Sequence, residues 1–301
     1  MAYILCGGTN ATVTIDGVEV EEDMSLVSGG AIDESVSTLP YDFYQGRAVV
    51  LDGYIHIMGC YVSNYRTKHY KWDGTSWTSV PSLPYGFYDS SAVVKDNEIH
   101  ILGSIYTNCY RYHYKYNGTS WTKVSTIPYD FYNGGAVVYQ DEIHILGGSA
   151  SGKSHYKFDG TSWTSVSNII YDFIQGCAVV LNNEIHLLGS SGSSNNKKHY
   201  KYDGTSLTSV STLPYSFYYG CAVVQKDEIH IMSTTNSSSY YKYHYKYNGT
   251  SWTKLSDLPY SFCLGSAVVH QDIIHILGSS DGNYTNHYAI QKPIYVKGGA
   301  A

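Results

Sequence analysis

Short apolar runs alternate with turn residues along most of the chain, and the whole pattern repeats. The segment Ala-Val-Val begins at Ala48, Ala92, Ala136, Ala178, Ala222 and Ala267. Successive copies are therefore separated by 44, 44, 42, 44 and 45 residues. A period of about 20 to 50 residues is the signature of a repeat architecture, in which each copy is one structural unit.

Each copy contains four β-type runs separated by turns. Residues 134–166 read GGAVVYQDEIHILGGSASGKSHYKFDGTSWTSV. A polar turn joins the first two runs, and the last two flank Asp159-Gly160, a dipeptide that accepts the positive φ of a tight hairpin. The pattern predicts one four-stranded antiparallel meander per copy.

Six such sheets bury their faces best when they are stacked radially, because one four-stranded sheet cannot cover both of its own faces. We therefore predict an all-β, six-bladed β-propeller. The chain resembles the kelch family over roughly residues 30 to 290: an apolar first strand, a second strand ending in Gly-Gly, then Tyr and Trp at fixed offsets. Gly-Gly is intact only at Gly147-Gly148, so we expect the turn after the second strand to be less uniform than usual.

The ends of the repeat array indicate how the ring closes. The last copy lacks Gly-Thr-Ser-Trp after His287-Tyr288, whereas ESVSTLPY before the first copy matches TSVSTLPY before the fifth. We expect residues 34–39 to complete the sixth blade and remove an open edge. Two alternatives stay open: the tail IQKPIYVKG supplies this strand, or YILCGG and VTIDG are remnants of a seventh blade. The predicted domains are a small β appendage over residues 1–29, which is a candidate attachment element, and the propeller over 30–301.

Twelve of the thirteen histidines occupy two repeat positions, with only His270 unassigned. The second-strand positions are His56, His100, His144, His186, His230 and His275. The positions before the third-strand aromatic are His69, His113, His155, His199, His244 and His287. Metal ligands converge from unlike elements, so these histidines favour a structural role over a ring-shaped metal site. We expect no metal and no cofactor.

The tryptophans and cysteines follow the same logic. Trp77, Trp121, Trp163 and Trp252 share one position, which Leu207 takes in the fourth copy, so blade packing explains them better than ligand stacking. The six cysteines show no CxxC pair, and we expect free thiols. Cys177 and Cys221 precede Ala-Val-Val, which predicts small core thiols near the central channel.

Composition narrows the class of partner. Charged residues make up 15% of the chain and the net charge is -6, so neither nucleic acid nor an acidic membrane is an expected partner. The N-terminus lacks a basic leader, and no stretch approaches about 18 apolar residues, so membrane insertion is not expected.

Sequence diversity is concentrated on one face of the predicted ring. The loops between the second and third strands read CYVSNYRT, SIYTNCYRY, GSASGKS, SSGSSNNKK, TTNSSSYYKY and SSDGNYTN, whereas DGTSW or NGTSW turns on the opposite face barely change. Tyr, Ser, Asn and Gly dominate these loops, as in recognition loops, although relaxed constraint on solvated loops is the alternative. The connections between blades lie on the same face, and kelch proteins that bind peptides draw their pocket residues from these two loop classes.

The resemblance therefore points to a set of candidate ligand-binding residues on these loops. They are Tyr44, Gln45, Tyr61, Tyr65, Arg66, Tyr88, Asp89, Tyr106, Asn108, Tyr132, Asn133, Gln175, Tyr218, Tyr219 and Tyr240. The recurring Phe43, Phe87, Phe131, Phe173, Phe217 and Phe262 are instead predicted to pack between blades. Such an aromatic, weakly charged rim suits a sugar or a neutral peptide better than a phosphate, which calls for clustered arginines.

Catalysis ranks second to recognition. A sialidase-like site needs converging arginines, but the chain has only Arg47, Arg66 and Arg111. Copper oxidases of this fold use Tyr and His from unlike positions, whereas these repeat in register. Paired carboxylates such as Asp141-Glu142 lie in the first turn, away from the diversified face. We expect no catalytic residues.

The near-identical copies indicate recent duplication, which is compatible with phage tail components, adhesins and surface proteins. We expect a receptor-binding protein of a virion or cell surface that recognises a glycan or protein receptor, with the N-terminal segment as a possible anchor. The alternatives are a structural assembly subunit, an intracellular (cytoplasmic) kelch adaptor and a propeller glycoside hydrolase. The sequence leaves the ligand and the oligomeric state open.

Overall fold

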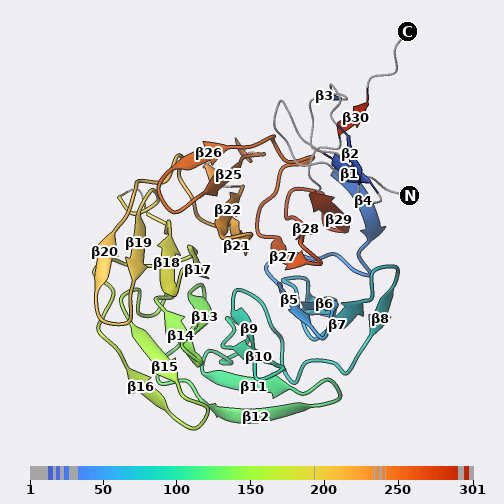
Figure 1. The fold of residues 1–301 in the computed structure, drawn as a ribbon. Coiled ribbons are helices and arrows are strands. Elements are labelled where there is room, and N and C mark those ends of the chain that lie inside the picture. Colours follow the sequence, from blue (N-terminus) through green and yellow to red (C-terminus); the bar gives the residue numbers. More distant parts are fainter. Residues whose placement is uncertain are drawn as a thin grey trace.

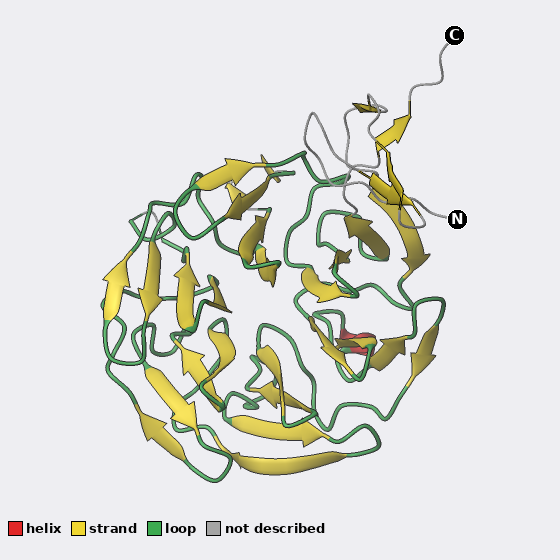
Figure 2. Ribbon diagram, in the orientation of Figure 1, coloured by secondary structure: helices red, strands yellow, loops and turns green. Residues whose placement is uncertain are grey.

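The computed structural model describes residues 33–290 apart from 193, 234, 237–238 and 241, together with four short strands nearer the termini. Six four-stranded antiparallel sheets are arranged around a central axis, so the predicted all-β, six-bladed propeller is confirmed (Figure 1). Loops connect the strands throughout, and the described residues contain one short 3-10 helix, η1 (Ser63–Tyr65) (Figure 2). No helix in this part of the chain is long and apolar enough to cross a membrane.

The strands of each blade run outward from the axis in sequence order, with one exception in the sixth blade. Blades 1 and 2 comprise β5 (Arg47–Leu51), β6 (Tyr54–Met58), β7 (His69–Trp72), β8 (Trp77–Ser79) and β9 (Ser91–Lys95), β10 (Glu98–Leu102), β11 (Tyr112–Tyr116), β12 (Trp121–Thr126). Blades 3 and 4 comprise β13 (Gly135–Tyr139), β14 (Glu142–Leu146), β15 (His155–Phe158), β16 (Trp163–Ser165) and β17 (Cys177–Leu181), β18 (Glu184–Leu188), β19 (His199–Tyr202), β20 (Leu207–Ser209). Blades 5 and 6 comprise β21 (Cys221–Gln225), β22 (Glu228–Met232), β25 (His244–Tyr247), β26 (Trp252–Lys254) and β27 (Ser266–His270), β28 (Ile273–Leu277), β29 (Asn286–Ile290), β4 (Asp33–Thr38).

The N-terminal strand β4 closes the ring. It pairs antiparallel with β29, and Ser37 lies opposite His287, so the predicted closure is confirmed one residue earlier at each end than expected. The tail does not supply this strand: β30 (Tyr295–Lys297) pairs with β3 (Met24–Leu26). The described strands near the N-terminus form no four-stranded seventh blade, because β1 (Val13–Ile15) and β2 (Val18–Val20) make a two-stranded ladder. The appendage and anchor predictions for residues 1–29 rest mostly on residues outside the described part.

The hydrophobic core lies in the seams between neighbouring blades. One cluster, for example, joins Met58 of blade 1 to Phe87, Ile99 and Ile101 of blade 2. All six repeat phenylalanines are fully buried, which confirms their predicted position between blades. Removing one such ring costs about 3–5 kcal/mol, so the seams tie the blades into one unit.

The repeat histidines form buried pairs inside the blades. In each pair, Nδ1 of the second-strand histidine lies 2.8–2.9 Å from Nε2 of the third-strand histidine. Desolvation lowers the pKa of every member, to about 4 in the second strand and about 3 in the third. Neutral imidazole can donate from one ring nitrogen and accept at the other, so a neutral pair forms this hydrogen bond, whereas a doubly protonated pair would place two N–H donors against each other.

The turn after the second strand has one backbone conformation at its first position and differs between blades at its second. Five glycines and Ser233 take φ values of 61–65° at its first position. At the second position, small side chains bond to the connection between blades: Ser104 Oγ donates to Gly86 O at 2.8 Å, and Ser190 Oγ donates to Asp172 O at 2.7 Å. The backbone differs at this second position, because Gly148 has a φ of 108° whereas Ser104 and Ser190 are not among the residues with positive φ.

Candidate ligand-binding site

Six equivalent residues, one from each connection between blades, form a closed ring of backbone hydrogen bonds around the channel mouth. They are Gln45, Asp89, Asn133, Gln175, Tyr219 and Leu264, and we call them the channel ring. Each N–H donates to the carbonyl of its neighbour around the axis, with N···O distances of 2.6–3.0 Å. All six have φ between 49° and 58°. Non-glycine residues in this left-handed region cost of order 1–3 kcal/mol each, and such strain concentrates at functional sites.

The side chains of the channel ring differ although their backbones are equivalent. Gln45 Nε2 donates to both carboxylate oxygens of Asp89 at 2.9 Å, and Gln175 Nε2 donates to the Tyr219 hydroxyl. Asn133 Nδ2 instead donates to Ser149 Oγ at 3.2 Å. Five side chains of the channel ring are therefore polar, and the sixth, Leu264, is apolar.

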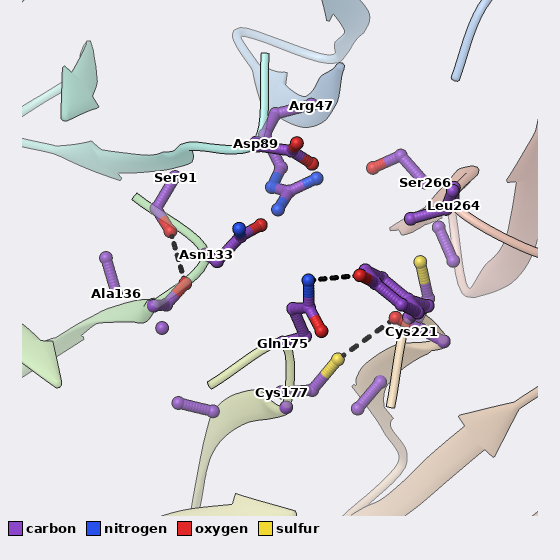
Figure 3. Close-up of a pocket in the computed structure, with 18 of the residues that line it drawn as sticks. Arg47, Asp89, Ser91, Asn133, Ala136, Gln175, Cys177, Cys221, Leu264 and Ser266 are labelled. Carbon is purple, nitrogen blue, oxygen red and sulfur yellow. Dashed lines mark hydrogen bonds between the residues drawn. The ribbon is translucent and has the colours of Figure 1, made fainter. Parts of the chain in front are cut away.

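Below this ring the channel encloses a pocket of about 180 Å³. The first residues of the inner strands line it, including Arg47, Ser91, Cys177, Cys221 and Ser266 (Figure 3). Figure 3 shows the Arg47 side chain reaching toward the middle of the pocket beside Asp89. Arg47 Nη1 donates to Gly46 O at 2.9 Å.

Asp89, Cys177 and Cys221 in the pocket have shifted pKa values. Burial raises the pKa of Asp89, while the positive charge of Arg47 and the hydrogen bond from Gln45 oppose this change. Burial also raises the pKa of Cys177 to about 11, and the pKa of Cys221 rises for the same reason. Their sulfurs donate to Gly220 O and Gly265 O at 3.2 and 3.1 Å, so both are protonated core thiols at the channel, as predicted.

Beside the channel ring, tyrosines from blades 6, 1 and 2 and their connections form a continuous strip. Neighbouring ring centroids lie 5.5 Å apart for Tyr284 and Tyr44, 5.8 Å for Tyr44 and Tyr61, 5.5 Å for Tyr61 and Tyr88, and 6.3 Å for Tyr88 and Tyr106. We call these five residues the tyrosine strip. Tyr61 is 48% exposed and Tyr284 is 36% exposed, so the strip forms part of the surface.

Arg66 caps one end of the tyrosine strip. Its guanidinium carbon lies 5.3 Å from the Tyr88 ring centroid and 4.8 Å from that of Tyr106, within cation–π range. Its Nε donates to Tyr61 O at 3.2 Å. Arg66 therefore fixes two aromatic planes of the strip and brings one positive charge to it.

Gly86 makes room for the last ring of the strip. A Cβ at Gly86 would lie 2.4 Å from Cδ1 of Tyr106. The equivalent connections carry Asp42, Asp130, Asp172, Ser216 and Ser261. Blade 2 thus has glycine at a connection over which a tyrosine folds back.

The ligand-binding residues predicted from the sequence lie in several separate parts of this face. The strip holds Tyr44, Tyr61, Tyr88 and Tyr106, and the channel ring holds Gln45, Asp89, Asn133, Gln175 and Tyr219. Tyr132 pairs with Tyr110 at 5.3 Å, and Tyr218 packs on Tyr219 at 5.6 Å. Asn108 is exposed in a turn, and the side chain of Tyr240 lies outside the described residues.

Tyr65 turns inward rather than joining the strip. Its ring lies 5.3 Å from that of the buried Tyr41, within the core of the seam between blades 6 and 1. Sequence reasoning missed Tyr284, Arg47 and Leu264 as members of the site. Leu264 shares the repeat position of Gln45, and Tyr284 lies in a variable loop, so both had a signal in the repeat alignment.

Comparisons with known proteins bear on the fold. No protein-family model matches the chain, and no curated protein matches it. Among solved structures, one described as "Structure of YjhT" superposes with a TM-score of 0.76 over 87% of this chain and 99% of that chain, at 14% sequence identity. At this identity the likeness concerns the fold alone. The chain therefore has a kelch-like, six-bladed β-propeller fold similar to that of YjhT.

Proposed function

We propose that this chain is a non-enzymatic recognition module that binds a glycan or a weakly charged protein surface through the tyrosine strip and the adjoining channel ring. The observation that carries the proposal is the continuity of the strip, in which five tyrosines from separate loops pack against one another in tilted and T-shaped pairs. Tyrosine supplies large, rigid, amphipathic contact area at low entropic cost. Its ring face packs on the apolar face of a sugar, and its hydroxyl bonds to sugar hydroxyls.

The charges on this surface favour a neutral or singly charged ligand. Arg66 is the one arginine stacked on the strip, whereas Arg111 donates to the backbone carbonyls of Ile127 and Pro128. A phosphate-binding site would call for several converging cations. A receptor-binding role at a virion or cell surface fits this chemistry, with an assembly subunit or intracellular adaptor as the alternatives.

The channel pocket gives less support to hydrolysis. Asp89 is the single carboxylate among the residues that line it, and glycoside hydrolysis by the common route needs two. No group of three or more metal-ligating side chains occurs within the described residues. Recognition therefore remains the better proposal.

Binding to a glycan array tests the proposal. We expect the double variant Tyr61→Ala/Tyr284→Ala to lose at least about tenfold in affinity, because it removes the most exposed rings of the strip. Tyr54→Ala is the matched control: Tyr54 begins β6 next to the first turn, on the opposite face, where Lys71 stacks on its ring at 4.2 Å.

A second variant displaces a ring without truncating it. Gly86→Asp places a side chain where Tyr106 now lies, at a position that carries aspartate in three other connections. We expect weaker binding with little change in unfolding temperature, while Asp130→Gly, its counterpart one connection further, leaves binding unchanged. Binding that survives both strip variants would refute the proposal. Multimers that dissociate on the same changes would favour assembly, and turnover of a glycoside would favour an enzyme.

A further inference from the structure

A repeated aromatic stack fills four of the seams between blades. In each, the third-strand histidine of one blade contacts two rings of the next blade. His113, for example, lies 4.9 Å from Phe158 and 5.6 Å from Trp163, by ring centroids. The same arrangement joins His69 to Tyr116 and Trp121, His199 to Tyr247 and Trp252, and His287 to Trp72 and Trp77.

The seam between blades 3 and 4 lacks the second ring. His155 lies 5.1 Å from Tyr202, but Leu207 of β20 occupies the tryptophan position. A cavity of about 190 Å³ lies there, lined by His155, Tyr202 and Leu207 among others. Its lining comes from β14, β15 and the connection after β16 in blade 3, and from β19, β20 and the turn between them in blade 4.

The hydrogen-bond acceptor for the missing indole is also in place. In the preceding seam, Trp163 Nε1 donates to Ser125 Oγ at 2.9 Å. Ser167 is the repeat equivalent of Ser125 and lines the cavity. Its counterparts Ser37, Ser125 and Ser211, in seams that hold the indole, are half-buried, whereas Ser167 is exposed, as is Ser256 in the seam between blades 5 and 6.

The entrance to the cavity departs from the repeat as well. Ile170 replaces the proline found in the other five connections, and it is 59% exposed. Ile170 is the single strongly exposed large apolar side chain among the described residues that line the cavity. A protein partner would need about 1,000 Å² of complementary surface, so this small apolar opening suits a small molecule better.

We propose that this cavity is a binding site for a small planar aromatic molecule of the indole class. A ring at this place stacks on His155 and Tyr202 as Trp163 stacks on His113 and Phe158, and its N–H reaches the Ser167 hydroxyl. The volume is adequate, since an apolar cavity of about 150 Å³ binds benzene. This proposal is independent of the function proposed above for the tyrosine strip and the channel ring.

Titration of the full-length protein with a fluorine-labelled indole, followed by fluorine NMR, tests this inference. We expect saturable binding to the wild type and a loss of at least about tenfold in affinity in Leu207→Trp, because the new indole occupies the cavity. Leu207→Phe serves the same purpose with a smaller ring if the first variant does not fold. Thr208→Trp is the matched control: it adds an indole at the neighbouring exposed position of β20 and leaves the cavity open.

Two results would overturn the inference: no saturable binding to the wild type, or binding that persists undiminished in a folded Leu207 variant. N-acetyltryptophanamide provides a further arm. Tighter binding of this amide than of indole would assign the cavity to the tryptophan side chain of a peptide partner and reject a free small molecule.

Discussion

Ser233 occupies a backbone position that glycine fills in the other five blades. Its φ is 61°, in the left-handed region, where a side chain costs about 1–2 kcal/mol. Its buried Oγ has no hydrogen-bond partner among the described residues. Blade 5 therefore carries both a conformational cost and an unsatisfied polar group at one residue.

Replacing Ser233 by glycine should stabilise the protein by about 1 kcal/mol, because relief of both costs outweighs the extra chain entropy of glycine. Urea unfolding followed by tryptophan fluorescence measures this change. The reverse substitution is the control: Gly103→Ser should destabilise, since a Cβ at Gly103 would lie 1.9 Å from Phe131 O. A loss of stability in Ser233→Gly would refute the argument.

At the scale of the element, one serine adds side-chain hydrogen bonds to the backbone pairing by which β4 closes the ring. Ser37 Oγ lies 2.9 Å from Nδ1 of His287 and accepts a hydrogen bond from Trp77 Nε1 at 3.1 Å. A single hydroxyl thus links the N-terminal strand to blade 6 and to blade 1. Ser125 makes the same two contacts in an uninterrupted seam, to His113 and Trp163.

Ser37→Ala should lower the free energy of unfolding by about 1–3 kcal/mol, because it leaves buried donors and acceptors unpaired at the closing seam. Hydrogen exchange should show the largest loss of protection in β29 and β4. Thr38→Ala, which alters the next and exposed residue of the same strand, should change stability little. Equal effects of the two substitutions would argue that the hydroxyl is not what fastens β4.

For the whole molecule, six buried histidine pairs make stability depend on pH. An unfolded histidine has a pKa of about 6.5, whereas the native values lie at about 3 to 4. Below pH 6.5 the unfolded chain therefore binds protons that the native protein does not, and stability falls as pH falls. Above pH 6.5 both states are neutral at these sites, so this contribution to the pH dependence vanishes.

We expect the unfolding temperature to be nearly constant above pH 7 and to fall steeply between pH 6.5 and pH 5, with each histidine contributing about 1.4 kcal/mol per pH unit at most. Thermal unfolding across this pH range measures the effect. Calorimetry in buffers of different ionisation enthalpy should detect net proton uptake on unfolding at pH 5.5. Equal stability at pH 5 and pH 7 would contradict the neutral-pair model.

The sequence by itself determined the architecture, because strand-forming and turn-forming residues recur at the same positions in every copy. Ala-Val-Val, Ile-His and Asp-Gly at a constant period specify four strands and their turns, and the unmatched ESVSTLPY predicted the closing strand while two alternatives stayed open. It also predicted that the variable loops and the connections between blades share one face, since equivalent repeat positions lie on one face of a symmetric ring.

Only the tertiary structure decided which of those residues act together. Whether Tyr65 packs inward while Tyr61 joins the strip depends on side-chain directions in loops of unequal length, which no period encodes. The closed channel ring arises between blades, from backbone groups far apart in sequence. The cavity at Leu207 likewise exists because a neighbouring blade stays in place when one indole is absent, which is a property of packing and not of local pattern.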